Sequence, residues 1–218
     1  MKTLKAALLA GMILFAGAAQ AAEPREKYHR CNADIDGANG SSVSVSINFN
    51  LDGSPKSRTA VWTPPSEQVA PRLLTVMVFY DEPTEQGIGP VDNVTVMALM
   101  RGTPMLKDAD VKFDVGGGKS WGVKIIGDPP SVMSNGVPIS LGLAFLGNRG
   151  DKPINTDLLD AMGSFGRSTV TVTSVQGVPI AGAVYDLGAR AERDAMFAQA
   201  WAKAAKAAEK PKRCKKTD

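Results

Sequence analysis

Two cysteines, Cys31 and Cys214, stand near opposite ends of the chain, and they limit the folds open to it. In an oxidising compartment such a pair predicts one disulfide, which would bring a C-terminal helix beside the first strand. The closed loop of about 183 residues would stabilise the fold by up to about 5 kcal/mol, because it restricts the unfolded chain. The alternatives are two free thiols, an intermolecular bridge, or a metal site that includes His29 and lacks a fourth ligand.

Residues 1–21 have the pattern of a secretory signal peptide. Lys2 and Lys5 precede an apolar run, and Ala19-Gln20-Ala21 is a small-residue cleavage motif. The apolar run is shorter than the roughly 20 residues that cross a bilayer, which argues against a membrane anchor. We therefore expect cleavage near Ala21, a periplasmic or secreted protein, and no transmembrane segment in the mature chain.

The middle of the chain favours β structure. Apolar and polar residues alternate from Val43 to Leu51, which is the pattern of a half-buried strand. Two nearly continuous apolar runs, at 73–80 and 94–100, are typical of central strands. Strand follows strand with no helix between them, so an antiparallel sandwich or barrel is favoured over a βαβ fold. Shorter strands are expected at 59–62, 111–115, 120–126, 139–145 and 168–175.

Two segments have helical patterns: a short one at Thr156–Met162 and a longer, Ala-rich one at 189–209. The longer helix carries an apolar stripe, for which we predict packing in the core; the alternative is an exposed face for a partner or a membrane. We also expect a polar turn at 32–42 before the first strand and a two-residue hairpin turn at Gln176-Gly177. The stripe consists of Met196, Phe197, Ala200, Trp201, Ala204 and Ala205.

The predicted fold class is mainly β: a single antiparallel β-sandwich with a short inserted helix and a C-terminal α-helix. Residues 22–209 would form this domain, and residues 210–218 a basic tail that carries Cys214. Loss of Lys2 and Lys5 with the leader reduces 25 basic side chains to 23, against 22 acidic ones. Such near neutrality argues against nucleic-acid binding by the whole surface. The tail cations are candidates for contact with anionic lipid or polysaccharide, unless they only aid solubility. These cations are Lys210, Lys212, Arg213, Lys215 and Lys216.

Several short motifs lack the context that their chemistry needs. The segment Gly118–Gly122 fits the nucleophile elbow of hydrolases, and Gly116–Ser120 is similar to the end of a phosphate-binding loop. Both motifs require a helix where a strand is expected, so we interpret them as one hairpin loop. Asn32–Asp36 copies the start of a calcium loop, but the twelfth position is Val43 where a Glu is needed. We interpret that segment as part of the polar turn.

The layout from Val137 to Trp201 is strand, short helix, a Val/Thr strand after Gly166-Arg167, a turn at Gly177, and Val184–Gly188 leading into an Ala-bearing helix. This layout, over the C-terminal third of the chain, resembles the proteobacterial periplasmic family typified by the invasion-associated locus B protein. The resemblance implies a secreted β-sandwich with no known catalytic residues, associated with the cell envelope or with host contact. The single cysteine pair is fewer than members often have, and no functional residue is carried over.

We expect a non-catalytic interaction or structural protein of the bacterial cell envelope, without cofactor or metal, whose partner is an envelope or host protein. This expectation depends on the lack of a convergent catalytic set in a chain with one histidine. One alternative is an envelope hydrolase that uses loop carboxylates such as Asp81, Glu82 or Asp108. The other is a periplasmic carrier that binds a small ligand between its sheets.

Overall fold

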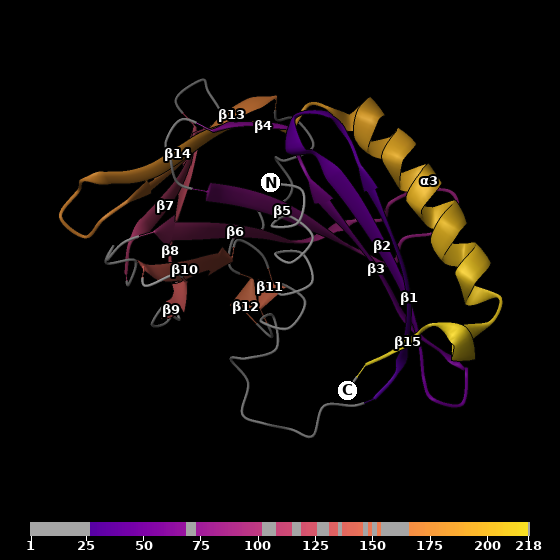
Figure 1. The fold of residues 1–218 in the computed structure, drawn as a ribbon. Helices are drawn as coiled ribbons and strands as arrows, with labels where there is room; N and C mark the ends of the chain where they lie inside the picture. Colours follow the sequence, from indigo (N-terminus) through magenta and orange to yellow (C-terminus); the bar gives the residue numbers. More distant parts are fainter. Residues whose placement is uncertain are drawn as a thin grey trace.

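The computed structural model describes residues 27–68, 73–101, 108–114, 119–125, 131–134, 137–145, 148–149, 152–153 and 166–217. Within these residues the chain is mainly β, with two antiparallel sheets and a long helix near the C-terminus (Figure 1). The predicted fold class is therefore confirmed. The short helix predicted at Thr156–Met162 lies outside the described residues.

The larger sheet has the strand order β15-β1-β2-β3-β5-β6-β10-β9, and the second sheet has the order β4-β14-β13-β7-β8. Every strand predicted from the sequence has a counterpart in one of them. The larger sheet contains β1 (His29–Asp36), β2 (Ser42–Phe49), β3 (Pro55–Thr63), β5 (Leu73–Asp81), β6 (Val91–Arg101), β9 (Ser131–Ser134), β10 (Val137–Phe145) and β15 (Lys215–Lys216). The second contains β4 (Ser66–Gln68), β7 (Asp110–Asp114), β8 (Ser120–Lys124), β13 (Arg167–Thr173) and β14 (Pro179–Asp186). The remaining elements are the ribbon of β11 (Asn148–Arg149) and β12 (Lys152–Pro153), the helix α3 (Arg190–Ala208), and the 3-10 turns η1 (Ala38–Gly40) and η3 (Pro211–Arg213).

Alternation along the strands determines which face of the larger sheet is apolar. In β2, Val43 and Val45 are fully buried, and the strand register places them opposite Trp62 and Ala60 of β3. Trp62 is 2% exposed and is among the largest fully buried side chains of the described residues. The serines between the valines point to the opposite face, because successive side chains of a strand alternate.

The second sheet covers part of this apolar face, so both sheets share one hydrophobic core. Phe113 of β7 and Tyr185 of β14 are almost completely buried in it. The Tyr185 hydroxyl donates a hydrogen bond of 2.5 Å to the backbone carbonyl of Leu74 in β5. This bond satisfies a buried phenol and joins the two layers of the sandwich.

The helix α3 packs against β1 and β2 of the larger sheet (Figure 1). Met196, Phe197, Ala200 and Ala204 of its stripe are buried, while Trp201 lies half-buried at the margin. The predicted core packing of the stripe is thus confirmed. Across the part of the chain that the structure describes, no helix combines the length and the apolar character needed to cross a bilayer.

Strand β1 corrects the first half of the polar turn predicted at 32–42. Residues 32–36 pair with β2 as part of β1, and the turn is confined to residues 37–41, which include η1. Asp34 lies within β1, although aspartate is depleted in strands, so pairing and the covering helix decide the conformation over local propensity. An extended strand cannot wrap a cation, which also removes the calcium-loop reading of Asn32–Asp36.

The β13–β14 hairpin has a three-residue loop, where a two-residue turn was predicted. The backbone N–H of Ser174 donates to the carbonyl of Val178 at 2.9 Å, which closes the loop around the intervening residues. Gly177, the last of them, has φ +78, a left-handed conformation that favours glycine. A turn followed by a left-handed residue is a common hairpin class, so the glycine was identified correctly and only the loop length was misjudged.

Candidate functional site: a basic pocket at the disulfide

A disulfide joins Cys31 of β1 to Cys214, which follows η3, across 183 residues of sequence. The two Cα atoms are 5.0 Å apart, and Cys31 is 2% exposed, so this end of the bond lies beneath the surface. The predicted disulfide is confirmed. The alternative metal site with His29 is excluded, because neither sulfur is free to act as a thiolate ligand.

The chain end is also held by hydrogen bonds. Strand β15 pairs with the start of β1, and Lys215 lies opposite Arg30. Beyond β15, the N–H of Thr217 donates to the carbonyl of Tyr28 at 2.9 Å, and the N–H of Tyr28 donates to Thr217 Oγ1 at 3.2 Å. The basic segment after α3 is therefore attached to β1 by a covalent bond and by main-chain pairing.

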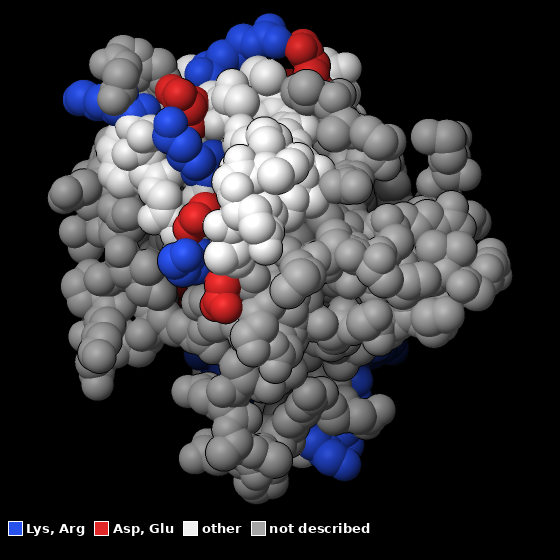
Figure 2. All heavy atoms as spheres, turned by 90° about the vertical axis from the view of Figure 1, so that its left-hand side faces the viewer, with Lys and Arg blue, Asp and Glu red and all other residues white. Residues whose placement is uncertain are grey.

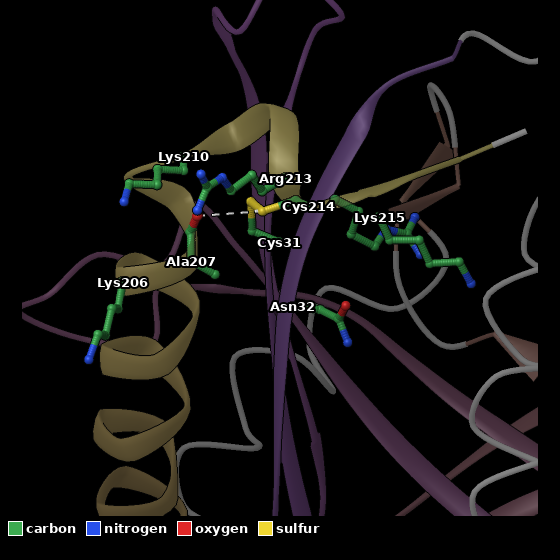
Figure 3. Close-up of a pocket in the computed structure, with 9 residues that line it drawn as sticks. Cys31, Asn32, Lys206, Ala207, Lys210, Arg213, Cys214 and Lys215 are labelled. Carbon is green, nitrogen blue, oxygen red and sulfur yellow. Dashed lines mark hydrogen bonds between the residues drawn. A yellow bond between two sulfur atoms is a disulfide. The ribbon is translucent and has the colours of Figure 1, made fainter.

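A pocket of about 310 Å³ opens beside the disulfide (Figure 3). It lies between β1, the last turns of α3 and the segment that leads through η3 into β15. In Figure 3, Lys206, Lys210 and Arg213 lie on the helix side of the disulfide, whereas Asn32 and Lys215 lie on the other side. We call this feature the disulfide pocket. The polar side chains that line it around the two cysteines are Arg30, Asn32, Lys206, Lys210, Arg213 and Lys215.

Five of these lining residues are basic and none is acidic. In the described part of the chain, none of the five forms an ion pair with a carboxylate. The face around the second sheet is different, because charges of both signs are mixed there (Figure 2). On that sheet Lys124 pairs with Asp110 at 3.3 Å and Arg167 pairs with Glu67 at 2.7 Å. Among the described residues, positive charge is therefore concentrated at the pocket.

The C-terminal end of α3 offsets only part of this positive charge. A helix dipole places about half a negative charge at the C-terminus, and there the carbonyl of Ala207 accepts the N–H of Lys210 at 3.2 Å. Cys214 Sγ lies 3.6 Å from the same oxygen (Figure 3). This is a van der Waals contact, because a disulfide sulfur carries no hydrogen to donate. The five cations exceed the dipole charge about tenfold, so the dipole does not neutralise them.

Arg30 is positioned by Tyr28. Its guanidinium donates a hydrogen bond to the Tyr28 hydroxyl, and its central carbon lies 5.3 Å from the centroid of the ring. The Nε atom of Arg30 is buried and has no hydrogen-bond partner. These contacts restrict the Arg30 side chain before any ligand binds, which lowers the entropy cost of using it.

The pocket overlaps the predicted basic tail only in part. Lys212 and Lys216 of that tail do not line it, whereas Lys210, Arg213 and Lys215 do. The sequence analysis missed Arg30 and Lys206, because both precede the tail. Arg30 adjoins Cys31 and Lys206 lies one helical turn before the tail, so the predicted disulfide and helical periodicity together contained the signal for both.

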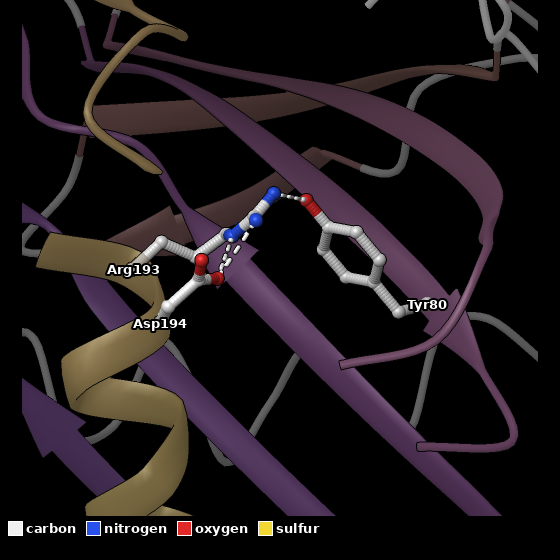
Figure 4. A network of polar contacts seen from close by, with 3 residues as sticks. All are labelled: Tyr80, Arg193 and Asp194. Atoms are coloured by element: carbon white, nitrogen blue, oxygen red, sulfur yellow. Dashed lines mark hydrogen bonds and ion pairs between the residues drawn. The ribbon is translucent and has the colours of Figure 1, made fainter. Parts of the chain in front are cut away.

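A second polar cluster, formed by Tyr80, Arg193 and Asp194, joins the start of α3 to the larger sheet (Figure 4). The Arg193 guanidinium binds Asp194 Oδ1 at 2.7 and 2.8 Å and donates to the Tyr80 hydroxyl at 3.2 Å. It also lies 5.6 Å from the ring centroids of Trp62 and Tyr80. Burial raises the pKa of the Tyr80 phenol, against the opposing charge of Arg193. This cluster anchors the helix to β3 and β5.

The loop carboxylates considered for hydrolysis are exposed. Asp81 ends β5, while Glu82 and Asp108 adopt left-handed φ values of 46 and 57. Burial, followed by the charge of Asp81, raises the pKa of the nearby Asp92. Among the described residues, no group of three or more His, Cys, Asp or Glu side chains is placed to hold a metal ion. The hydrolase alternative stays a prediction.

Ser120 lies at the start of β8, opposite Asp114 of β7. A strand stands where the nucleophile elbow and the phosphate-binding loop both require a helix. The antiparallel pairing of β7 with β8 supports the hairpin interpretation, and residues 115–118 between them lie outside the described residues.

No protein-family model, curated protein or solved structure matches this chain. The resemblance to the invasion-associated locus B family therefore stays a prediction.

Proposed function

We propose that the protein is exported and acts as a non-catalytic interaction protein of the bacterial cell envelope, which attaches to anionic lipid or polysaccharide through the disulfide pocket. The leader-like pattern of residues 1–21 supports export. The disulfide supports it independently, because such bonds persist mainly in oxidising compartments.

The observation that carries the proposal is the fixed placement of cations at the chain end. Lys210, Arg213 and Lys215 belong to a segment that the disulfide and β15 hold against β1. A flexible tail would lose backbone freedom on binding, whereas a held segment has already lost it. The disulfide and β15 therefore hold these cations at one edge of the larger sheet.

The expected strength is that of a reversible attachment. A Lys or Arg near an anionic membrane contributes about 1 kcal/mol, so five pocket cations contribute up to about 5 kcal/mol. The Debye length falls from about 10 Å at 0.1 M salt to about 3 Å at 1 M. The attachment should therefore weaken strongly as salt is added.

Vesicle sedimentation tests this proposal. We expect the protein to bind vesicles that contain phosphatidylglycerol, to ignore vesicles of phosphatidylcholine alone, and to dissociate as salt rises from about 0.1 to about 1 M. Replacing Lys206, Lys210 and Lys215 by Gln should weaken binding about 100-fold, at about five-fold for each cation.

The control is Lys112→Gln, which removes one exposed cation from β7 in the second sheet. We expect less than about a two-fold change, because β7 lies in the second sheet, apart from β1 and the end of α3 (Figure 1). Equal binding to neutral and anionic vesicles, or equal losses in the control and in single pocket variants, would contradict the proposal.

A further inference from the structure

We propose that the disulfide pocket binds a phosphomonoester group carried on a sugar or on a lipid headgroup. This inference deepens the proposed function, on which it rests, by naming the chemical group that the attachment recognises. Shape, donor chemistry and charge support it.

The shape of the site favours a protruding group. The pocket has a volume of about 310 Å³, far more than one water molecule needs. The pocket is broadly open to solvent, so a bulky carrier can stay outside it. A phosphate that projects from its carrier can enter it together with part of the carrier.

The donors that line the pocket suit phosphate. Arg213 presents a planar fork of N–H groups, which matches two oxygens of one phosphate. Lys206 and Lys210 lie on the same side of the disulfide as Arg213 and add donors without fixed direction (Figure 3). A phosphomonoester offers three strong acceptor oxygens, so it can engage the Arg213 fork and a lysine of that side at once.

The charge of the site favours a monoester over singly charged groups. A phosphomonoester carries about −1.5 to −2 at pH 7 because its second pKa is about 6. A carboxylate, a sulfate ester or a phosphodiester carries a single negative charge. Since the lining residues include three cations on the helix side of the disulfide and no acid, the doubly charged form gains the most on binding.

A comparison of a phosphate ester with the sulfate ester of the same sugar tests this inference. We expect glucose 6-phosphate to bind the protein at least about ten-fold more tightly than glucose 6-sulfate, measured by calorimetry. Affinity for the phosphate should fall between pH 7 and pH 5, as the ligand loses its second charge, and affinity for the sulfate should not. The single histidine, His29, does not line the pocket, and the five charged lining residues are Lys or Arg.

Two double variants with equal charge separate the pocket from the basic segment as a whole. Lys210→Gln with Arg213→Gln removes two lining cations, whereas Lys212→Gln with Lys216→Gln removes two cations outside the lining. We expect at least about a ten-fold loss of glucose 6-phosphate affinity in the first and less than about two-fold in the second. Both should retain the disulfide and the circular dichroism spectrum of the parent protein.

Competition identifies the carrier. Displacement of the protein from phosphatidic acid vesicles by glucose 6-phosphate would place lipid and sugar phosphates in the same pocket. Binding of the sugar phosphate without vesicle binding would assign the site to free phosphosugars and would contradict the proposed envelope attachment. Equal affinity for phosphate and sulfate esters, or equal losses in the two double variants, would overturn this inference and leave a diffuse anionic attachment intact.

Discussion

Gly37 lies where β1 turns into η1, directly against the first turns of α3. A Cβ atom on this residue would stand 2.6 Å from Glu192 Oε1 and 2.7 Å from Met196 Sδ. Its φ of −110 is open to any residue, so the requirement for glycine is one of space. The Glu192 oxygen accepts hydrogen bonds from Ser41 Oγ at 2.8 Å and from the N–H of Ala38 at 3.2 Å, and a Cβ would displace it from both.

We expect Gly37→Ala to lower the free energy of unfolding by about 1 kcal/mol, because the Glu192 side chain must leave its hydrogen bonds to Ser41 and Ala38. Urea denaturation measures it. Gly87→Ala is the matched control, because a Cβ there meets nothing within 4 Å. That change should be neutral or stabilise by up to about 1 kcal/mol through the unfolded chain. Equal effects of the two substitutions would contradict the steric account.

At the scale of elements, the helix α3 depends on Arg193 as well as on its apolar stripe. The Arg193 side chain is 17% exposed and bridges two aromatic rings and Asp194. We expect Arg193→Ala to destabilise the protein by about 2–3 kcal/mol, because it removes charged hydrogen bonds and stacking contacts from a largely buried place. The measurement is again the free energy of unfolding in urea.

Arg167→Ala is the comparison for that helix variant. Arg167 pairs with Glu67 at 2.7 Å, a short distance, yet the two side chains are 64% and 71% exposed. Exposed pairs contribute about 1 kcal/mol or less. We therefore expect Arg193→Ala to lower the free energy of unfolding much more than Arg167→Ala. The reverse order would show that the Arg193 cluster does not anchor α3.

The elements that sequence patterns could predict are those whose pattern is local. The alternation in β2 and the stripe in α3 identify each element and its buried face, because burial and periodicity coincide there. β1 was missed because Asp34 and Asp36 disfavour strands, whereas pairing with β2, the covering helix α3 and the disulfide stabilise it. Arg193 was missed because its aromatic partners belong to strands more than 100 residues earlier in the sequence.

The candidate site shows the same division. The basic residues after α3 form one cluster in the sequence and were identified as an anionic contact. Their assignment to a recess required the three-dimensional placement of Arg30 and Lys206 beside Cys214. Lys212 and Lys216 are equally basic, and no local property of the sequence separates them from the residues that line the pocket.

At the scale of the whole molecule, the Cys31–Cys214 bond holds both ends of the fold. We expect Cys31→Ser with Cys214→Ser to lower the free energy of unfolding by up to about 5 kcal/mol, since the bond closes a loop of 183 residues. The measurement is the urea midpoint. Because β15 then keeps only its short pairing with β1, backbone amides from Lys215 to Thr217 should exchange hydrogen faster in this variant.

A matched check uses the parent protein under reducing conditions, which should reproduce the behaviour of the serine variant without any change of side chain. Mass spectrometry of the parent under non-reducing conditions should show two hydrogens fewer than after reduction. Unchanged exchange at Lys215 to Thr217 in the serine variant would mean that hydrogen bonding alone holds the chain end.

The union of the first strand with the final residues has a consequence for biogenesis. Ribosomes add about 5–20 residues each second, and 183 residues separate the two cysteines. Synthesis of Cys214 therefore follows synthesis of Cys31 by about 10–40 s. During that interval the edge of β1 that pairs with β15 has no partner strand. The disulfide therefore forms late relative to β1, and a nascent polypeptide that stops short of Cys214 cannot form it.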